Sequence, residues 1–129
     1  MAKRKPEMRI RSWGIYTAWD KASKQLPKLL EITTEIPAEI DIEFGLIVNV
    51  KRARNMQVHY SIDHPGILDA NGERRPPFDG SVYVRTNDWD FFLGDSIWEP
   101  LHDKVGQWNL SVSLEDTIDV TKAFNIATS

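Results

Sequence analysis

The sequence contains no cysteine, so disulfide bonds, cysteine-ligated metal sites and thiol nucleophiles are excluded. No apolar run approaches the ~18 residues that a membrane-spanning helix needs. The basic start of the chain is not followed by the apolar segment of a secretory signal. A cysteine-free chain fits a reducing compartment, and we expect a cytoplasmic protein that does not enter a membrane.

Recognisable catalytic motifs are also missing. The sequence has no G-x-S-x-G elbow, no G-x-x-x-x-G-K-[ST] loop, no H-E-x-x-H pair and no calcium-loop pattern. The sequence therefore gives no support for a serine hydrolase, a P-loop nucleotide-binding protein, a zinc protease or an EF-hand. We therefore expect a protein that is not an enzyme and that holds no metal and no cofactor.

The composition that remains is that of one folded domain, with 129 residues, 41% hydrophobic and 27% charged. The net charge of −3 is unevenly spread along the chain. Residues 1–11 hold five basic side chains and one acidic one, whereas residues 87–103 hold five carboxylates and neither Lys nor Arg. We expect residues 1–9 to form a basic, flexible arm and residues 10–126 to form a single domain.

Apolar side chains recur at every second position along most of the chain. This alternation places one set of side chains in a core and the other in water, and it is typical of antiparallel strands. The sequence predicts an all-β antiparallel β-sandwich of immunoglobulin-like type with about seven or eight strands. The sets expected on core faces are Trp13, Ile15, Thr17 and Trp19; Leu30, Ile32, Thr34 and Ile36; Ile40, Ile42, Phe44, Leu46, Val48 and Val50; Val58, Tyr60 and Ile62; Val82 and Val84; Trp89, Phe91 and Leu93; Trp108, Leu110, Val112 and Leu114; and Ile118, Val120, Phe124 and Ile126.

Two further features follow from this pattern. Asn87-Asp88 lies between two alternating segments with the spacing of a β-hairpin. Four aromatic residues lie on loops or on strand faces that point away from the core: Tyr16, Tyr83, Phe92 and Trp98. We expect their side chains to be exposed and to be available for an interface.

Several segments resemble a family of short bacterial proteins of unknown function. The segments are SWGIY, EIPAEIDIEFGLIVNV, IDHPGI, RPPFDG, NDWDFFLGD and a closing G-x-W-x-L-x-V pattern followed by F-x-I, spread from about Trp13 to Ile126. The resemblance implies an immunoglobulin-like or fibronectin-like β-sandwich. It implies no catalytic residue, because the family has no assigned activity.

The acidic segment 87–103 has three interpretations. Carboxylates in turns and on the wet face of a strand need no ligand, since they bond their own backbone and discourage edge pairing. A metal would need several oxygens converging on one point. A glycosidase would need two carboxylates ~5–9 Å apart, for which Asp95 and Glu99 are the best pair. We favour the first interpretation.

Two long connections, residues 64–80 and 95–106, are the expected places for binding contacts. The candidate binding residues are His64, Arg74, Arg75, Asp95, Trp98, Glu99 and His102. Pro76-Pro77 would stiffen the first connection and present its arginines to a partner.

The sequence therefore predicts a non-catalytic protein-binding or assembly module, with a protein partner or self-association, for example as a homodimer. One alternative is a small-ligand or carbohydrate-binding enzyme with its site between the two long connections. A second is a nucleic-acid-binding accessory protein that uses the basic arm with Lys51, Arg52 and Arg54.

Overall fold

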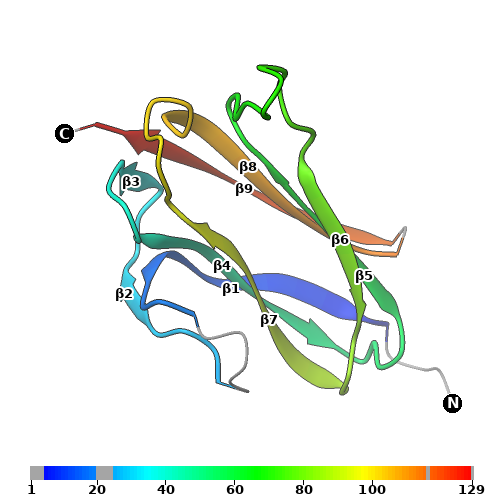
Figure 1. Ribbon diagram of the computed structural model, residues 1–129. Coiled ribbons are helices and arrows are strands. Elements are labelled where there is room, and N and C mark those ends of the chain that lie inside the picture. Colours follow the sequence, from blue (N-terminus) through cyan, green and yellow to red (C-terminus); the bar gives the residue numbers. More distant parts are fainter. Residues whose placement is uncertain (1–4, 20–24, 116, 129) are drawn as a thin grey trace, which may run out of the picture.

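The computed structural model describes residues 5–19, 25–115 and 117–128, and within them the chain folds into two facing β-sheets (Figure 1). The strands are β1 (Glu7–Tyr16), β2 (Leu29–Glu31), β3 (Glu35–Pro37), β4 (Glu43–Lys51), β5 (Gln57–Asp63), β6 (Phe78–Tyr83), β7 (Asp88–Ser96), β8 (Gly106–Leu114) and β9 (Ile118–Ala127). The described residues contain no helix that is long and apolar enough to cross a membrane.

The first sheet has the order β2-β1-β4-β7 and the second has the order β3-β9-β8-β5-β6. All neighbouring strands are antiparallel except β3 and β9, which pair in parallel over three residues. The all-β sandwich is thus confirmed, with nine strands in the described residues.

The core lies between β4 in one sheet and β8 in the other. The core-facing side chains of β4 are 0% exposed, and those of β8 are no more than 1% exposed. Phe44 meets Trp108 edge-on with ring centroids 5.3 Å apart, and it meets Phe124 in the same way at 5.6 Å. The apolar alternation predicted both strands correctly, because each is covered on one face by the other sheet.

The alternation failed over residues 30–36. Leu30 and Ile32, expected in the core, are 65% and 66% exposed, whereas Ile36 is 2% exposed. The segment forms two short strands that belong to different sheets, β2 at the edge of the first and β3 at the edge of the second. A chain that changes sheets does not keep one face toward the core.

The predicted hairpin at Asn87-Asp88 is also wrong, because β6 and β7 lie in different sheets. The chain crosses from one sheet to the other there, and the Asn87 carbonyl accepts a hydrogen bond from the Arg52 amide at 2.9 Å. As a result β6 and β7 are both edge strands, and they border the same side of the sandwich (Figure 1).

The first strand begins earlier than expected. Glu7 pairs with Lys51 and Arg9 with Asn49, so residues 7–9 belong to β1 and not to an arm. Residues 1–4 of the predicted arm lie outside the described residues.

The outer face of the first sheet carries a second aromatic cluster. Phe92 lies in register with Ile47, on the face opposite the core, and its ring meets Tyr16 and Trp19 edge-on at 5.1 Å each. Tyr16 and Phe92 are each 2% exposed, so the predicted exposure of these two rings is wrong, as is the core position of Trp19. Burial raises the pKa of the Tyr16 hydroxyl despite its 2.8 Å hydrogen bond with Ser12. This cluster covers part of the outer face of the first sheet, reaching from Tyr16 on β1 to Phe92 on β7.

Candidate functional site

The two long connections meet at one end of the sandwich. The Leu68 amide donates to the Asp103 carboxylate at 3.5 Å, and the rings of Phe78 and Trp98 are 6.4 Å apart. The His64 ring lies 5.3 Å from Phe78. Side chains from both connections therefore pack into one cluster.

The centre of this cluster is a buried lysine. Lys104 is 0% exposed, and its Nζ donates to Asp103 Oδ1 at 2.6 Å and to the Pro100 carbonyl at 2.9 Å. The same ammonium lies 4.4 Å from the centroid of the Trp98 ring. The Lys104 carbonyl accepts a hydrogen bond from the Trp108 indole at 2.8 Å. Burying a cation is costly unless it is paired and hydrogen-bonded, and here three partners surround it.

The ionised form of Asp103 is favoured. Its burial opposes ionisation, but the hydrogen bond and charge of Lys104 outweigh burial, with smaller help from the Leu68 amide and His102, so the pKa of Asp103 is lowered. A carboxylate held ionised beside a fully paired lysine is poorly suited to accept or release protons near neutral pH. The pair is best explained as a structural tie for the loop.

His64 has a structural position as well. It is 2% exposed, its Nδ1 accepts the Ile67 amide at 2.9 Å, and its ring lies 6.3 Å from that of Trp108. Because Nδ1 is an acceptor, Nε2 carries the hydrogen of the neutral ring. That Nε2 atom is buried and has no partner among the described residues.

The other predicted binding residues do not gather around a shared cleft. Arg74 is bound to its own connection, donating to Asp63 at 3.0 Å and to the His64 carbonyl at 2.6 Å. Arg75, Glu99 and His102 are exposed, and Trp98 is 36% exposed. Asp95 lies on β7, where its carboxylate accepts the Ser96 amide at 2.8 Å. Within the described residues, no three His, Asp or Glu side chains are grouped so that they could hold a metal ion.

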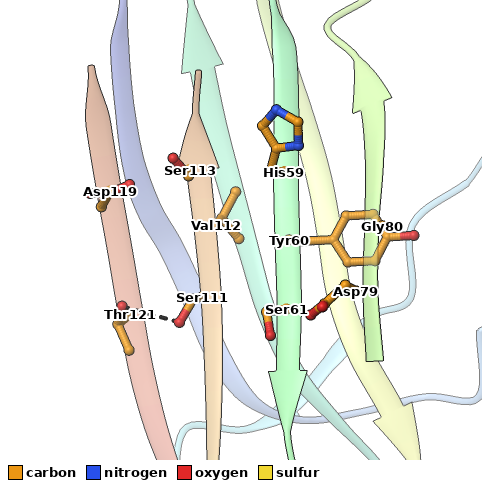
Figure 2. A pocket seen from close by; sticks show the side chains of 10 residues that line it. All are labelled: His59, Tyr60, Ser61, Asp79, Gly80, Ser111, Val112, Ser113, Asp119 and Thr121. Atoms are coloured by element: carbon orange, nitrogen blue, oxygen red, sulfur yellow. Dashed lines mark hydrogen bonds between the residues drawn. The ribbon is translucent and has the colours of Figure 1, made fainter. Parts of the chain in front are cut away.

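A polar hollow of about 510 Å³ lies on the outer face of the second sheet. Figure 2 shows its hydroxyl side chains in rows across β5, β8 and β9, with Ser61, Ser111 and Thr121 side by side. His59 and the carboxylates of Asp79 and Asp119 lie around them. Its polar side chains are short and solvent-facing, with no buried polar group aimed into the hollow. The hollow is adequately explained as the wet face of a twisted sheet.

A groove of different character lies where β6 and β7 face each other. It has a volume of about 370 Å³, and apolar side chains from both sheets line most of it, including Tyr60, Phe78, Val82, Phe91 and Leu93. All of these except Leu93 are only partly buried. The groove continues around the free edge of β7 to Gly94 and to the outer aromatic cluster.

Gly80 makes room for the Tyr60 ring, which lines the groove. A Cβ atom at position 80 would come within 2.2 Å of the Tyr60 hydroxyl oxygen. The Tyr60 and Phe91 rings have centroids 5.7 Å apart. Glycine at position 80 thus lets the tyrosine lie flat across the edge strand β6. Partly exposed aromatic and aliphatic side chains in a concave site are the usual lining of a binding pocket. Sequence patterns missed this groove because its two walls belong to different sheets.

Two of the basic residues near the start of β1, Arg11 and Arg52, are paired with carboxylates. Arg52 contacts Glu7 at 2.8 Å, Arg11 forms an ion pair with Asp90, and Lys51 faces Asp88 in register. A nucleic-acid interface needs a surface on which positive charge is in excess. These two pairings reduce the excess of positive charge on this part of the surface.

The architecture is that of an immunoglobulin-like β-sandwich. The structure is similar to the crystal structure of an immunoglobulin-like protein from Pseudomonas aeruginosa, with a TM-score of 0.71, 21% sequence identity, and coverage of 94% of this chain and 97% of that chain. A family model described as a domain of unknown function, DUF3859, matches residues 4–126. The chain belongs to this family. No curated protein matches the sequence.

Proposed function

We propose that this protein is a non-catalytic protein-binding module that binds its partner in the groove between β6 and β7. The observation that carries the proposal is the position of the groove: it lies between two edge strands, so a partner can approach without displacing any strand. The partly exposed Tyr60, Phe78, Val82 and Phe91 offer apolar area that contact with a protein would bury. Immunoglobulin-like folds host many functions, so the argument rests on this site and not on the fold. A cytoplasmic location, which suits a cysteine-free chain, is part of the proposal.

The proposal is tested by placing a charge in the groove. Val82 lines the groove, whereas Ser81 is exposed on the opposite face of the same strand. We expect a partner captured from the native host to re-form a complex with the purified wild-type protein and with Ser81→Lys. The same partner should lose most of its affinity for Val82→Lys. Equal binding to all three proteins would contradict the groove as the binding site.

Self-association is a second candidate, favoured by the exposed edge strand β2. Leu30 on β2 and Ile32 just after it are more than half exposed, and among the described residues β2 pairs with β1 alone. A concentration-dependent dimer, measured by analytical ultracentrifugation and lost in Leu30→Lys, would support this function. A monomer at all concentrations would exclude it.

A further inference from the structure

A small polar hollow lies on the outer face of the first sheet, where β1, β4 and β7 run side by side. It has a volume of about 190 Å³ and is lined by Arg9 and Arg11 from β1, Asn49 and Lys51 from β4, and Asp88 from β7. The volume is below the ~300 Å³ at which pockets for drug-sized ligands begin. The hollow therefore has room for a single ionic group.

Two of the cations that line the hollow have no carboxylate partner. Arg11 forms an ion pair with Asp90, whereas Arg9 and Lys51 form no ion pair within residues 5–19, 25–115 and 117–128. Arg9 lies opposite Asn49 in the register of β1 and β4, so Lys51 is its diagonal neighbour on the same face of the sheet. Long side chains at diagonal positions can reach one another, and like charges on paired strands are destabilising. An anion between Arg9 and Lys51 would contact both cations and relieve their repulsion.

The carboxylates around the hollow are held by other partners. Asn49 is 6% exposed, and its Nδ2 donates to Asp88 at 2.8 Å and to Asp90 at 2.9 Å. Glu7 contacts Arg52 at 2.8 Å. The buried amide and the neighbouring arginine thus fix these three carboxylates, and the two unpaired cations remain available to a ligand.

We infer that the hollow binds the phosphate group of a small molecule, held between Arg9 and Lys51. A phosphate group carries about −1.5 to −2 charge near neutral pH, which matches two unpaired cations, whereas a carboxylate would neutralise one of them. The forked N–H groups of a guanidinium also fit the oxygens of phosphate. This site lies apart from the groove between β6 and β7, and it is independent of the proposed function.

The acidic residues beside the hollow restrict the source of the phosphate. Asp88 lines the hollow, and Glu7 and Asp90 lie opposite Lys51 and Asn49 in the sheet. A nucleic-acid backbone or an anionic membrane would bring further phosphates next to these carboxylates, where like charges repel. The ligand is therefore a small phosphorylated compound, and not a polymer or a lipid surface.

The test is a titration of the full-length protein with inorganic phosphate, followed by NMR of the backbone amides and arginine side chains. Saturable shifts should centre on Arg9, Arg11 and Lys51. Arg9→Gln and Lys51→Gln should each weaken binding at least about fivefold, because each removes a charged hydrogen-bond donor. Asp88→Asn should strengthen binding, because it removes the negative charge among the lining residues. A gain of affinity cannot come from misfolding.

Arg75→Gln is the matched control, since it removes one exposed positive charge from the connection at the opposite end of the sandwich. It should leave phosphate binding unchanged, sulfate should compete with phosphate, and acetate at the same ionic strength should not. Equal weakening in Arg75→Gln and Arg9→Gln, shifts that do not saturate, or equal affinity for acetate would overturn the site. Tighter binding of a single-stranded oligonucleotide or of phosphatidylserine vesicles than of inorganic phosphate, lost in Arg9→Gln, would overturn the assignment to a small compound.

Discussion

Lys104 Nζ lies 2.6 Å from Asp103 Oδ1, and the two side chains are 1% and 9% exposed. The two residues are adjacent in sequence, and the loop that carries them buries both side chains. The Pro100 carbonyl and the Trp98 ring complete the surroundings of the ammonium. The connection after β7 is thus organised around a buried ion pair, which holds it against the residues that follow β5.

Removing the carboxylate should destabilise the protein more than removing the ammonium. Asp103→Asn leaves the fully buried Lys104 without its counter-charge, and breaking such a pair typically costs about 3–5 kcal/mol. Lys104→Met leaves a carboxylate that is 9% exposed and still accepts the Leu68 amide, so a smaller loss is expected. Urea unfolding monitored by tryptophan fluorescence gives both values.

The double variant Asp103→Asn/Lys104→Met provides the control. Apolar replacement of a whole buried pair is often neutral, so the double variant should be more stable than Asp103→Asn alone. Simple addition of the two single losses would show that the residues do not interact as the structure indicates.

The same pair predicts a direction for acid unfolding. The pKa of Asp103 is lowered in the folded state from an ordinary value of 3.8. A depressed carboxylate pKa contributes stability that is complete above the unfolded value and is lost as pH falls through the folded value. Wild-type stability should therefore drop below about pH 4 more steeply than that of Asp103→Asn, a difference measurable from denaturation midpoints between neutral pH and pH 3. Parallel pH profiles would contradict this assignment.

Much of the sandwich could be predicted from alternation alone, and the reason is local. In β8 the core-facing set is buried and the outward-facing set is not, so alternation there separates the two faces cleanly. In the central strand β4 the core-facing set is also predicted correctly, but Glu43 and Asn49 on its other face are buried too. Alternation predicted Phe92 and Tyr16 to be exposed, and this was wrong because an aromatic cluster on the outer face of the first sheet buries both. Alternation identifies the face of a side chain but not what lies above that face.

The candidate sites were harder to predict. The two long connections do lie together at one end of the sandwich, and their role in binding stays a prediction. Lys104 was missed, because a lysine in an acidic loop gives no sequence signal of burial. The groove depends on which sheet each strand joins, and the Asn87-Asp88 turn suggested the wrong answer. Sheet membership is set by long-range pairing, which local patterns do not encode.

His64 should matter for stability and not for metal binding. His64→Ala removes a ring packed against Phe78 and Trp108 and leaves the Ile67 amide without its acceptor, so a loss of about 2–4 kcal/mol is expected. His102→Ala, at an exposed position of the second connection, should change stability by less than about 0.5 kcal/mol. Chemical denaturation measures both losses. Added zinc should leave the thermal midpoint of the wild type unchanged, and stoichiometric zinc that disappears in either variant would contradict the structural role.

Replacing Gly14, the single glycine of β1, by a residue with a side chain should destabilise the protein. Its φ is +137°, and a Cβ atom there would come within 1.9 Å of the Glu31 carbonyl oxygen of β2. Gly14→Ala must therefore push β2 away from β1 or distort the strand, at a cost of about 1–3 kcal/mol. Gly66→Ala is the matched control, because a Cβ atom at that position has no neighbour within 4 Å. The control should be neutral or slightly stabilising, since alanine restricts the unfolded chain. Hydrogen exchange at Leu29–Glu31 should accelerate only in Gly14→Ala, and equal unfolding midpoints for the two variants would show that β2 does not pack as closely on Gly14 as the structure has it.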